Sequence, residues 1–154
     1  MAQSHRDLIV WHKAMDLAEA DYGLAGKFPS AETYRLGSQI TRAAAFVPAN
    51  IAEGNARGTR RDYANFLSVA KGSLMETETF LMLSVRLKYL TQEETAAAFG
   101  LITEISKMLT ALRSRLQEGG VENQFGGSRI CSLFPIPYSL LPGTKEPHNV
   151  RNIS

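Results

Sequence analysis

The chain has 154 residues, of which 44% are hydrophobic and 21% charged, a composition typical of one globular domain with a substantial core. The formal net charge of +2 permits an acidic partner without requiring one, and the single cysteine, Cys131, excludes an internal disulfide framework. No signal-peptide pattern opens the chain, and charged residues interrupt its apolar runs before they reach the roughly 18 residues of a membrane span. We therefore expect a cytoplasmic protein with no membrane partner.

A first helix is predicted from about Leu8 to Lys27, after a flexible leader over residues 1–6. Phe28-Pro29 ends this helix, because proline cannot continue it. Apolar residues that recur every three or four positions share one helix face, and we expect the following set to be buried: Trp11, Met15, Ala18, Tyr22 and Ala25.

A second helix is predicted over residues 31–56, with Ser30 as its N-cap and Gly54 and Gly58 at its end. Pro48 lies inside this helix, where a proline lacks the backbone donor and crowds the preceding turn at a cost of about 3 kcal/mol. We therefore expect a kink. The apolar stripe comprises Leu36, Ile40, Ala43, Val47 and Ile51.

A third helix is predicted to run from the capping box of Thr59 and Asp62 to about Tyr89. Its core stripe comprises Tyr63, Phe66, Leu67, Ala70, Leu74, Thr77, Leu81 and Val85. A second apolar strip on its distal half comprises Phe80, Leu83 and Leu87. A helix that is apolar on two sides needs two partners, which are either other helices of the same chain or a second subunit.

A fourth helix is predicted to begin at the capping box of Thr91 and Glu94 and to end before Gly119-Gly120. Its stripe is the cleanest in the chain and comprises Ala98, Leu101, Ile102, Ile105, Met108, Leu109, Leu112 and Leu116. The predicted fold is therefore all-α: an elongated antiparallel up-down four-helix bundle over residues 7–118, with a proline-kinked second helix. We expect residues 119–154 to form an irregular, Pro/Gly-rich and poorly ordered tail. The alternative is that the apolar residues of this tail dock on the bundle.

Few side chains in the sequence suit catalysis. His12 and Asp16 lie one turn apart, but two ligands without a third do not make a metal site, so a solvated pair is the favoured interpretation. The sequence has no repeated Glu-x-x-His pattern for a di-iron centre and no glycine-rich phosphate loop. We expect no enzyme activity, no cofactor, no metal and no small-molecule substrate.

Two surfaces remain as candidate sites. A basic surface suited to phosphate contacts comprises Arg35, Arg42, Arg57, Arg60, Arg61 and Lys71. Its alternative interpretation is structural, with Arg57 and Arg60 pairing with neighbouring acids or helix carbonyls. A candidate oligomer interface comprises Phe46, Phe80, Leu83 and Leu87. Its alternative is packing within the monomer, and spacing alone decides neither case.

The segment from Ile40 to Gly54, with its Val-Pro-Ala-Asn-Ile-Ala-Glu-Gly string, resembles the signature of a known four-helix-bundle family. This family was first found in intervening sequences of bacterial large-subunit ribosomal RNA genes. Further matching residues are Asp7–Trp11, Phe28-Pro29, Phe66-Leu67 and Gly72–Leu74, so that the resemblance covers about residues 7–117. Phe46 and His12 depart from the residues that are common in the family.

The resemblance implies homopentamers that form a barrel with a central channel. It also implies similarity to the accessory variability determinant of diversity-generating retroelements, which partners a reverse transcriptase and RNA through basic surfaces. Carried over to this chain, it implies that Arg42, Arg57 and Arg61 face nucleic acid. Pro48, Asn50 and Glu53 look structural in that setting, with Asn50 and Glu53 satisfying backbone groups near the kink.

Two functions follow as hypotheses. The first is a non-enzymatic homo-oligomer, pentameric by resemblance, that binds nucleic acid, and RNA in particular, as an adaptor or accessory factor. The second is a protein–protein scaffold ring that has no direct role with nucleic acid.

Overall fold

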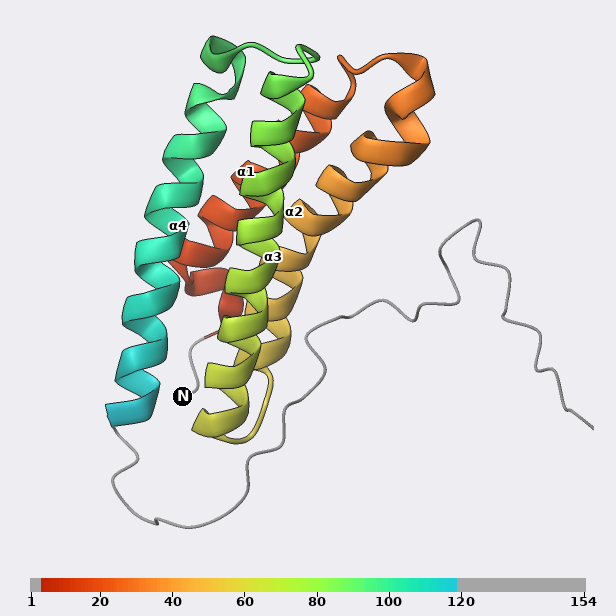
Figure 1. Ribbon diagram of the computed structural model, residues 1–154. Helices are drawn as coiled ribbons and strands as arrows, with labels where there is room; N and C mark the ends of the chain where they lie inside the picture. Colours follow the sequence, from red (N-terminus) through yellow and green to blue (C-terminus); the bar gives the residue numbers. More distant parts are fainter. Residues whose placement is uncertain (1–3, 119–154) are drawn as a thin grey trace, which may run out of the picture. The chain divides into compact units, whose positions relative to one another are not determined.

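Four long helices form an antiparallel bundle in the computed structural model, which describes residues 4–118 (Figure 1). The predicted all-α four-helix fold is confirmed. In chain order the helices are α1 (Ile9–Ala25), α2 (Ser38–Asn55), α3 (Arg60–Arg86) and α4 (Gln92–Glu118). Each helix packs on the one before it and α4 closes on α1, so the four helices form a square in which α1 faces α3 only diagonally. The predicted tail and Cys131 lie outside the described residues.

The N-terminal residues that are described form a short 3₁₀ helix, η1 (His5–Asp7), which begins in the predicted leader over residues 1–6 and ends at Asp7. Ser4 and Asp7 cap it reciprocally through side-chain to backbone hydrogen bonds. His5 and Trp11 meet edge to face with their ring centroids 5.2 Å apart. The His12 ring lies 2.7 Å from the Arg6 carbonyl oxygen through Nε2. These contacts hold η1 against the start of α1, and the His12 side chain takes part as a hydrogen-bond donor to the backbone of η1.

Helix α1 buries a different face from the one that its apolar spacing predicts. Of the predicted stripe, Ala18 is buried and Trp11 and Ala25 pack partly against the core, as expected. Met15 and Tyr22 are 44% and 60% exposed, so the prediction is wrong for these two residues. The bundle instead receives a neighbouring face with smaller side chains, which fit its narrow interior. The buried residues of α1 are Val10, Ala14, Leu17, Ala18, Asp21 and Leu24.

The connection from α1 to α2 is more irregular than the sequence predicts. A 3₁₀ turn, η2 (Ser30–Glu32), leads into one turn of π-helix, η3 (Thr33–Gly37), before α2 begins at Ser38. The prediction of Ser30 as the N-cap of an uninterrupted helix is therefore wrong. The Glu32 carboxylate accepts the Leu36 backbone N–H at 3.5 Å, so an acidic residue within the segment caps this widened turn.

Pro48 lies inside α2 and is buried, and α2 continues past it to Asn55. The predicted kink at this position stays a prediction. Asn50 donates from Nδ2 to the Phe46 carbonyl oxygen at 2.7 Å, one turn earlier in α2. The carbonyl that lacks a backbone donor because of Pro48 is that of Ala44, so the expected role of Asn50 at freed backbone groups stays a prediction. Glu53, expected to do the same, pairs with the Arg57 side chain instead.

Gly54 allows α2 and α3 to approach closely at their shared corner. A Cβ atom at this position would lie 2.7 Å from the Phe66 Cβ and 2.8 Å from the Tyr63 Cδ2, closer than van der Waals contact permits. Gly54 is buried in the last turn of α2, which ends one residue later at Asn55, close to the predicted end of this helix. Its lack of a side chain sets the distance between the two helices.

Both predicted capping sites begin helices as expected. The Thr59 hydroxyl accepts the Asp62 N–H at 3.0 Å at the start of α3. At α4 the capping is reciprocal, with the Glu94 N–H donating to Thr91 Oγ1 at 3.2 Å and the Thr91 N–H donating to the Glu94 carboxylate at 2.9 Å. These local pairs fix the two corners of the bundle.

Helix α3 ends in a left-handed turn at Lys88, where φ is 62°. The Lys88 N–H donates to the Val85 carbonyl at 3.0 Å, and the Tyr89 N–H donates to the Ser84 carbonyl at 3.0 Å. This is the hydrogen-bond pattern of a Schellman motif, in which glycine is the favoured left-handed residue. Lys88 therefore holds a conformation that is costly for a residue with a side chain.

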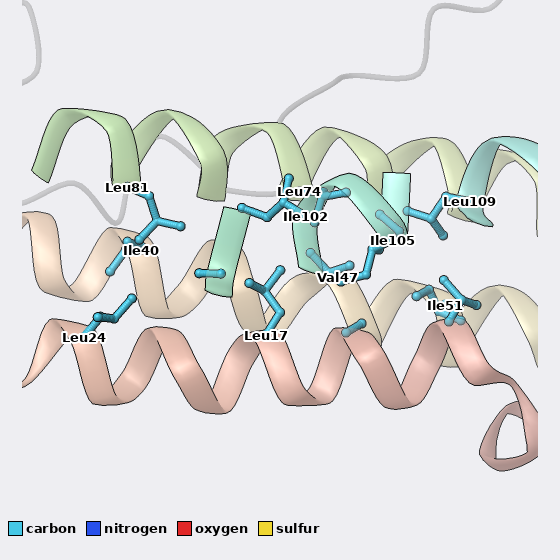
Figure 2. Packing of buried hydrophobic residues seen from close by; sticks show 14 of the residues in the cluster. Leu17, Leu24, Ile40, Val47, Ile51, Leu74, Leu81, Ile102, Ile105 and Leu109 are labelled. Atoms are coloured by element: carbon cyan, nitrogen blue, oxygen red, sulfur yellow. The ribbon is translucent and has the colours of Figure 1, made fainter. Parts of the chain in front are cut away.

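The core runs the length of the bundle as stacked aliphatic layers (Figure 2). Each layer combines aliphatic side chains from different helices, and Asp21 is the one charged side chain among the described residues that is buried with them. From one end to the other, the side chains labelled in Figure 2 are Leu24, Ile40 and Leu81, then Leu17, Leu74 and Ile102, then Val47 and Ile105, then Ile51 and Leu109.

Helix α4 is long and apolar enough to cross a membrane by length and composition, with a mean hydropathy of 1.2 over its 18-residue window. Its buried side chains Ile102, Ile105 and Leu109 nevertheless line the bundle core. Ion pairs join Lys13 to Glu104 and Lys27 to Glu94, which fastens α4 to α1. We therefore interpret α4 as a bundle helix.

Candidate nucleic-acid interface

Arg42 and Phe46 form an exposed cation–π pair on α2. They lie one turn apart, and the Arg42 guanidinium carbon is 5.4 Å from the centroid of the Phe46 ring. Arg42 is exposed and Phe46 is half-buried, so the ring supports the guanidinium from below while its N–H groups face solvent. Stacking of this kind restricts a flexible side chain without using its hydrogen-bond donors.

Arg57 occupies a similar arrangement at the corner between α2 and α3. Its guanidinium carbon lies 4.7 Å from the Phe66 ring centroid, and the same group forms an ion pair with Glu53 one turn earlier. Arg57 is therefore oriented by a ring from α3 and by a carboxylate from α2. The prediction that Arg57 pairs with Glu53 and the prediction that it faces solvent are compatible, because Arg57 remains exposed.

The remaining arginines of the predicted basic surface lie near the two ends of this face. Arg60 and Arg61 are exposed in the first turn of α3 and follow Arg57 across the corner. Arg35 lies in η3 at the opposite end, where it is exposed with its Nη1 3.8 Å from Glu32 Oε1. At about 1.5 Å per residue, the part of α2 from Arg42 to its last residue, Asn55, is about 20 Å long, and Arg57 lies just beyond that end. The arginines thus form an extended row rather than one cluster.

Lys71 does not belong to this row. Its ammonium group donates to Thr110 Oγ1 at 2.8 Å, so the side chain reaches across to α4. Because α4 lies on the other side of α3 from α2, Lys71 faces away from Arg42 and Arg57. Of the six predicted basic residues, the structure places five along the α2 side and the α2–α3 corner and sets Lys71 apart.

The residues of the predicted oligomer interface differ in their exposure and in their contacts within the chain. Phe46 is engaged by Arg42, and Phe80 is half-buried against the core. Leu83 is 40% exposed on α3, and Leu87, just after that helix, is 46% exposed. The two leucines are available for a partner in the single chain. Their role as an oligomer contact stays a prediction.

Asp21 is the titratable residue that spacing failed to single out. Its side chain is fully buried in α1, and neither carboxyl oxygen has a hydrogen-bond partner among the described residues. Burial raises the pKa of the Asp21 carboxyl from 3.8 to about 7. The sequence signal for it is the alternative apolar phase of α1, in which Leu17 and Leu24 flank an acidic residue.

Within residues 4–118 no three His, Cys, Asp or Glu side chains are grouped so as to hold a metal ion. The side chains that converge at the surface are guanidiniums supported by phenylalanine rings. Guanidiniums donate paired hydrogen bonds to phosphate oxygens, and the half-buried rings of Phe46 and Phe66 hold them in place at the surface. Among the described residues, the α2 face with the α2–α3 corner is therefore the surface best equipped to contact a nucleic acid.

Comparison with known proteins agrees with this bundle. The fold is similar to the crystal structure of a protein of unknown function from the S23 ribosomal protein family of Bacteroides thetaiotaomicron, with a TM-score of 0.62 and 27% sequence identity. The similarity covers 68% of this chain and 98% of that protein. No curated protein matches the sequence significantly. Residues 6–111 match the family described as 23S rRNA-intervening sequence protein. The chain therefore belongs to the 23S rRNA-intervening sequence protein family.

Proposed function

We propose that this protein is a non-enzymatic cytoplasmic homo-oligomer that binds nucleic acid, and RNA in particular, as an adaptor or accessory factor. The observation that carries the proposal is the pair of arginine–phenylalanine stacks, Arg42 on Phe46 and Arg57 on Phe66, on one face of the bundle. The family description names an intervening sequence of 23S rRNA, which is the reason that RNA is the first nucleic acid to test. The pentameric state and a reverse transcriptase as protein partner are expectations that come from the resemblance noted above.

Binding through this face depends little on sequence and strongly on salt. The guanidiniums contact phosphates, and each contact with a single strand contributes about 0.7 to the slope of log affinity against log salt concentration. Phe46 and Phe66 are held by their arginines and are half-buried, so they offer limited ring area for stacking. Phosphate contacts therefore supply most of the binding free energy in this proposal.

A mobility-shift titration with a single-stranded RNA tests the proposal. The test variant is Arg42→Glu/Arg57→Glu/Arg61→Glu, and the control is Lys107→Glu/Arg113→Glu/Arg115→Glu on α4, which changes net charge by the same amount. We expect the first variant to lose RNA retention and the control to keep it, with the helical circular dichroism signal unchanged in both. Equal loss in the two variants would show that net charge alone attracts RNA, and retention by the first variant would contradict the proposal.

A protein–protein scaffold ring is the second candidate function. The exposed apolar side chains of Leu83 and Leu87 favour it, as does the engagement of Arg57 by Glu53. It predicts a stable oligomer whose partners bind independently of salt and of Arg42. Absence of RNA retention by the wild-type protein, together with a stable oligomer in light scattering, would favour this candidate over the first.

A further inference from the structure

A shallow apolar hollow of about 340 Å³ lies between α1 and α2. It exists because α1 turns a second apolar strip outward, including the exposed Met15 and Tyr22. Pro48 forms part of its wall on α2, and Glu19 brings a carboxylate to it. The full lining is Met15, Ala18, Glu19, Tyr22, Ala45 and Pro48.

A second apolar hollow, of about 400 Å³, lies between α3 and α4. Met82 projects beside it with 53% of its surface exposed, and Arg86 brings a guanidinium to it. The full lining is Met82, Val85, Arg86, Gln92, Thr95 and Phe99. This hollow therefore resembles the first in its apolar lining but carries the opposite charge.

The two hollows lie on opposite sides of the bundle, because the helices pack in the cyclic order α1, α2, α3, α4. Within residues 4–118 neither Glu19 nor Arg86 forms an ion pair or a side-chain hydrogen bond. The α1–α4 side differs, because its lysines are paired internally with Glu94 and Glu104. Unpaired opposite charges beside matching apolar hollows are the features of two surfaces that complement each other.

We propose that the α1–α2 hollow of one copy packs against the α3–α4 hollow of the next, with Glu19 facing Arg86 of the neighbouring copy. Tyr22 and Met82 each project from one hollow and have a recess to enter in the other. A contact between two different faces on opposite sides repeats head to tail, and it closes into a ring if the rotation between copies permits.

This arrangement also determines where the basic row lies. The α2–α3 side is left free in every copy, and all copies present it on the same wall of the ring. Arg42 and Arg57 are thereby repeated around the assembly, so that one RNA strand contacts several copies at once and gains avidity. The inference rests on the self-association in the proposed function, and it does not depend on RNA binding.

Charge reversal at the two hollows tests the proposal by size-exclusion chromatography with light scattering. Glu19→Arg and Arg86→Glu each place like charges in the contact, and we expect each to weaken self-association at least about tenfold. The double variant restores opposite charges and should recover the wild-type oligomer. Asp16→Arg, an exposed acid one turn earlier on α1, is the matched control and should leave the oligomer unchanged. Circular dichroism checks that every variant remains helical.

The possible results separate this inference from the proposed function. A wild-type protein that stays monomeric would overturn both the homo-oligomer and this contact. A wild-type oligomer that persists in both single variants would overturn only the contact proposed here. If Leu83→Ser/Leu87→Ser dissociates that oligomer while the charge variants do not, the α3 leucines predicted from sequence form the interface instead. Loss in each single variant and recovery in the double variant is the result that the proposal requires.

Discussion

Replacing Asp21 with asparagine should stabilise the protein at neutral and alkaline pH and have little effect near pH 4. Asp21 is fully buried in α1 and its carboxyl oxygens have no hydrogen-bond partner among the described residues. Between pH 3.8 and about 7 the folded protein keeps a proton that the unfolded chain has released, and above about pH 7 it holds an uncompensated charge in the core. Asparagine has nearly the same shape and never carries that charge.

The magnitude follows from the difference between the folded and unfolded pKa values. The pKa of Asp21 is raised to about 7 in the folded protein from an ordinary 3.8, so between these values the folded state binds a proton that the unfolded state has lost. The part of the unfolding free energy that depends on Asp21 protonation is fully present below about pH 4. It falls by about 1.4 kcal/mol per pH unit above that and is lost by about pH 7. The total comes to roughly 4 kcal/mol, an order-of-magnitude figure.

Urea denaturation of the wild-type protein and Asp21→Asn between pH 4 and pH 8 measures this effect. The difference in unfolding free energy between the two proteins should grow with pH up to about 7 and then level off. Other titrating groups are common to both proteins and cancel in the difference. Asp16→Asn, an exposed position on the same helix, is the control and should show no such trend. A difference that is independent of pH would refute the argument that Asp21 is protonated in the folded core.

Three further predictions concern single residues. Gly54→Ala should destabilise the protein by about 1–3 kcal/mol in urea denaturation. The new Cβ would lie 2.7 Å from the Phe66 Cβ, and this clash outweighs the gain in helix propensity. An unchanged denaturation midpoint would contradict the close approach of α2 and α3. Lys88→Gly should raise stability by about 1 kcal/mol, because glycine adopts the left-handed φ of 62° without strain; a lower melting temperature would show that the lysine side chain is needed there. Glu53→Gln should tighten RNA binding in a mobility-shift titration, because it releases Arg57 from its ion pair and removes a carboxylate from the α2–α3 corner. Weaker binding would mean that the ion pair orients Arg57 for its ligand.

Local signals in the sequence predicted most of the fold. The four helices and the capping sites at Thr59 and Thr91 depend on residues three or four positions apart, and such interactions are visible in the sequence. The start of α2 was not predictable in the same way. There a 3₁₀ turn and a π turn between Ser30 and Gly37 replace the expected first turns, and Glu32 caps the π turn.

Choices that depend on packing against other helices were harder to predict. Helix α1 has two apolar faces, and spacing favoured the one with the larger side chains. The narrow bundle interior instead takes the face of Ala14 and Leu17, which also carries Asp21 inward.

The candidate site also has one contact that is local in the sequence and one that depends on helix packing. Arg42 and Phe46 lie one turn apart and can be matched from the sequence, whereas the stacking of Arg57 on Phe66 depends on how α2 meets α3.

Photo-crosslinking tests the central claim, that RNA contacts the α2 face and the α2–α3 corner, most directly. A single-stranded RNA containing 4-thiouridine is bound to the wild-type protein, irradiated, and digested, and the crosslinked peptides are identified by mass spectrometry. Our account predicts crosslinks within residues 42–66, which include Phe46 and Phe66, and predicts that they disappear at high salt. Crosslinks confined to α1 or α4, or no crosslinks at low salt, would contradict it.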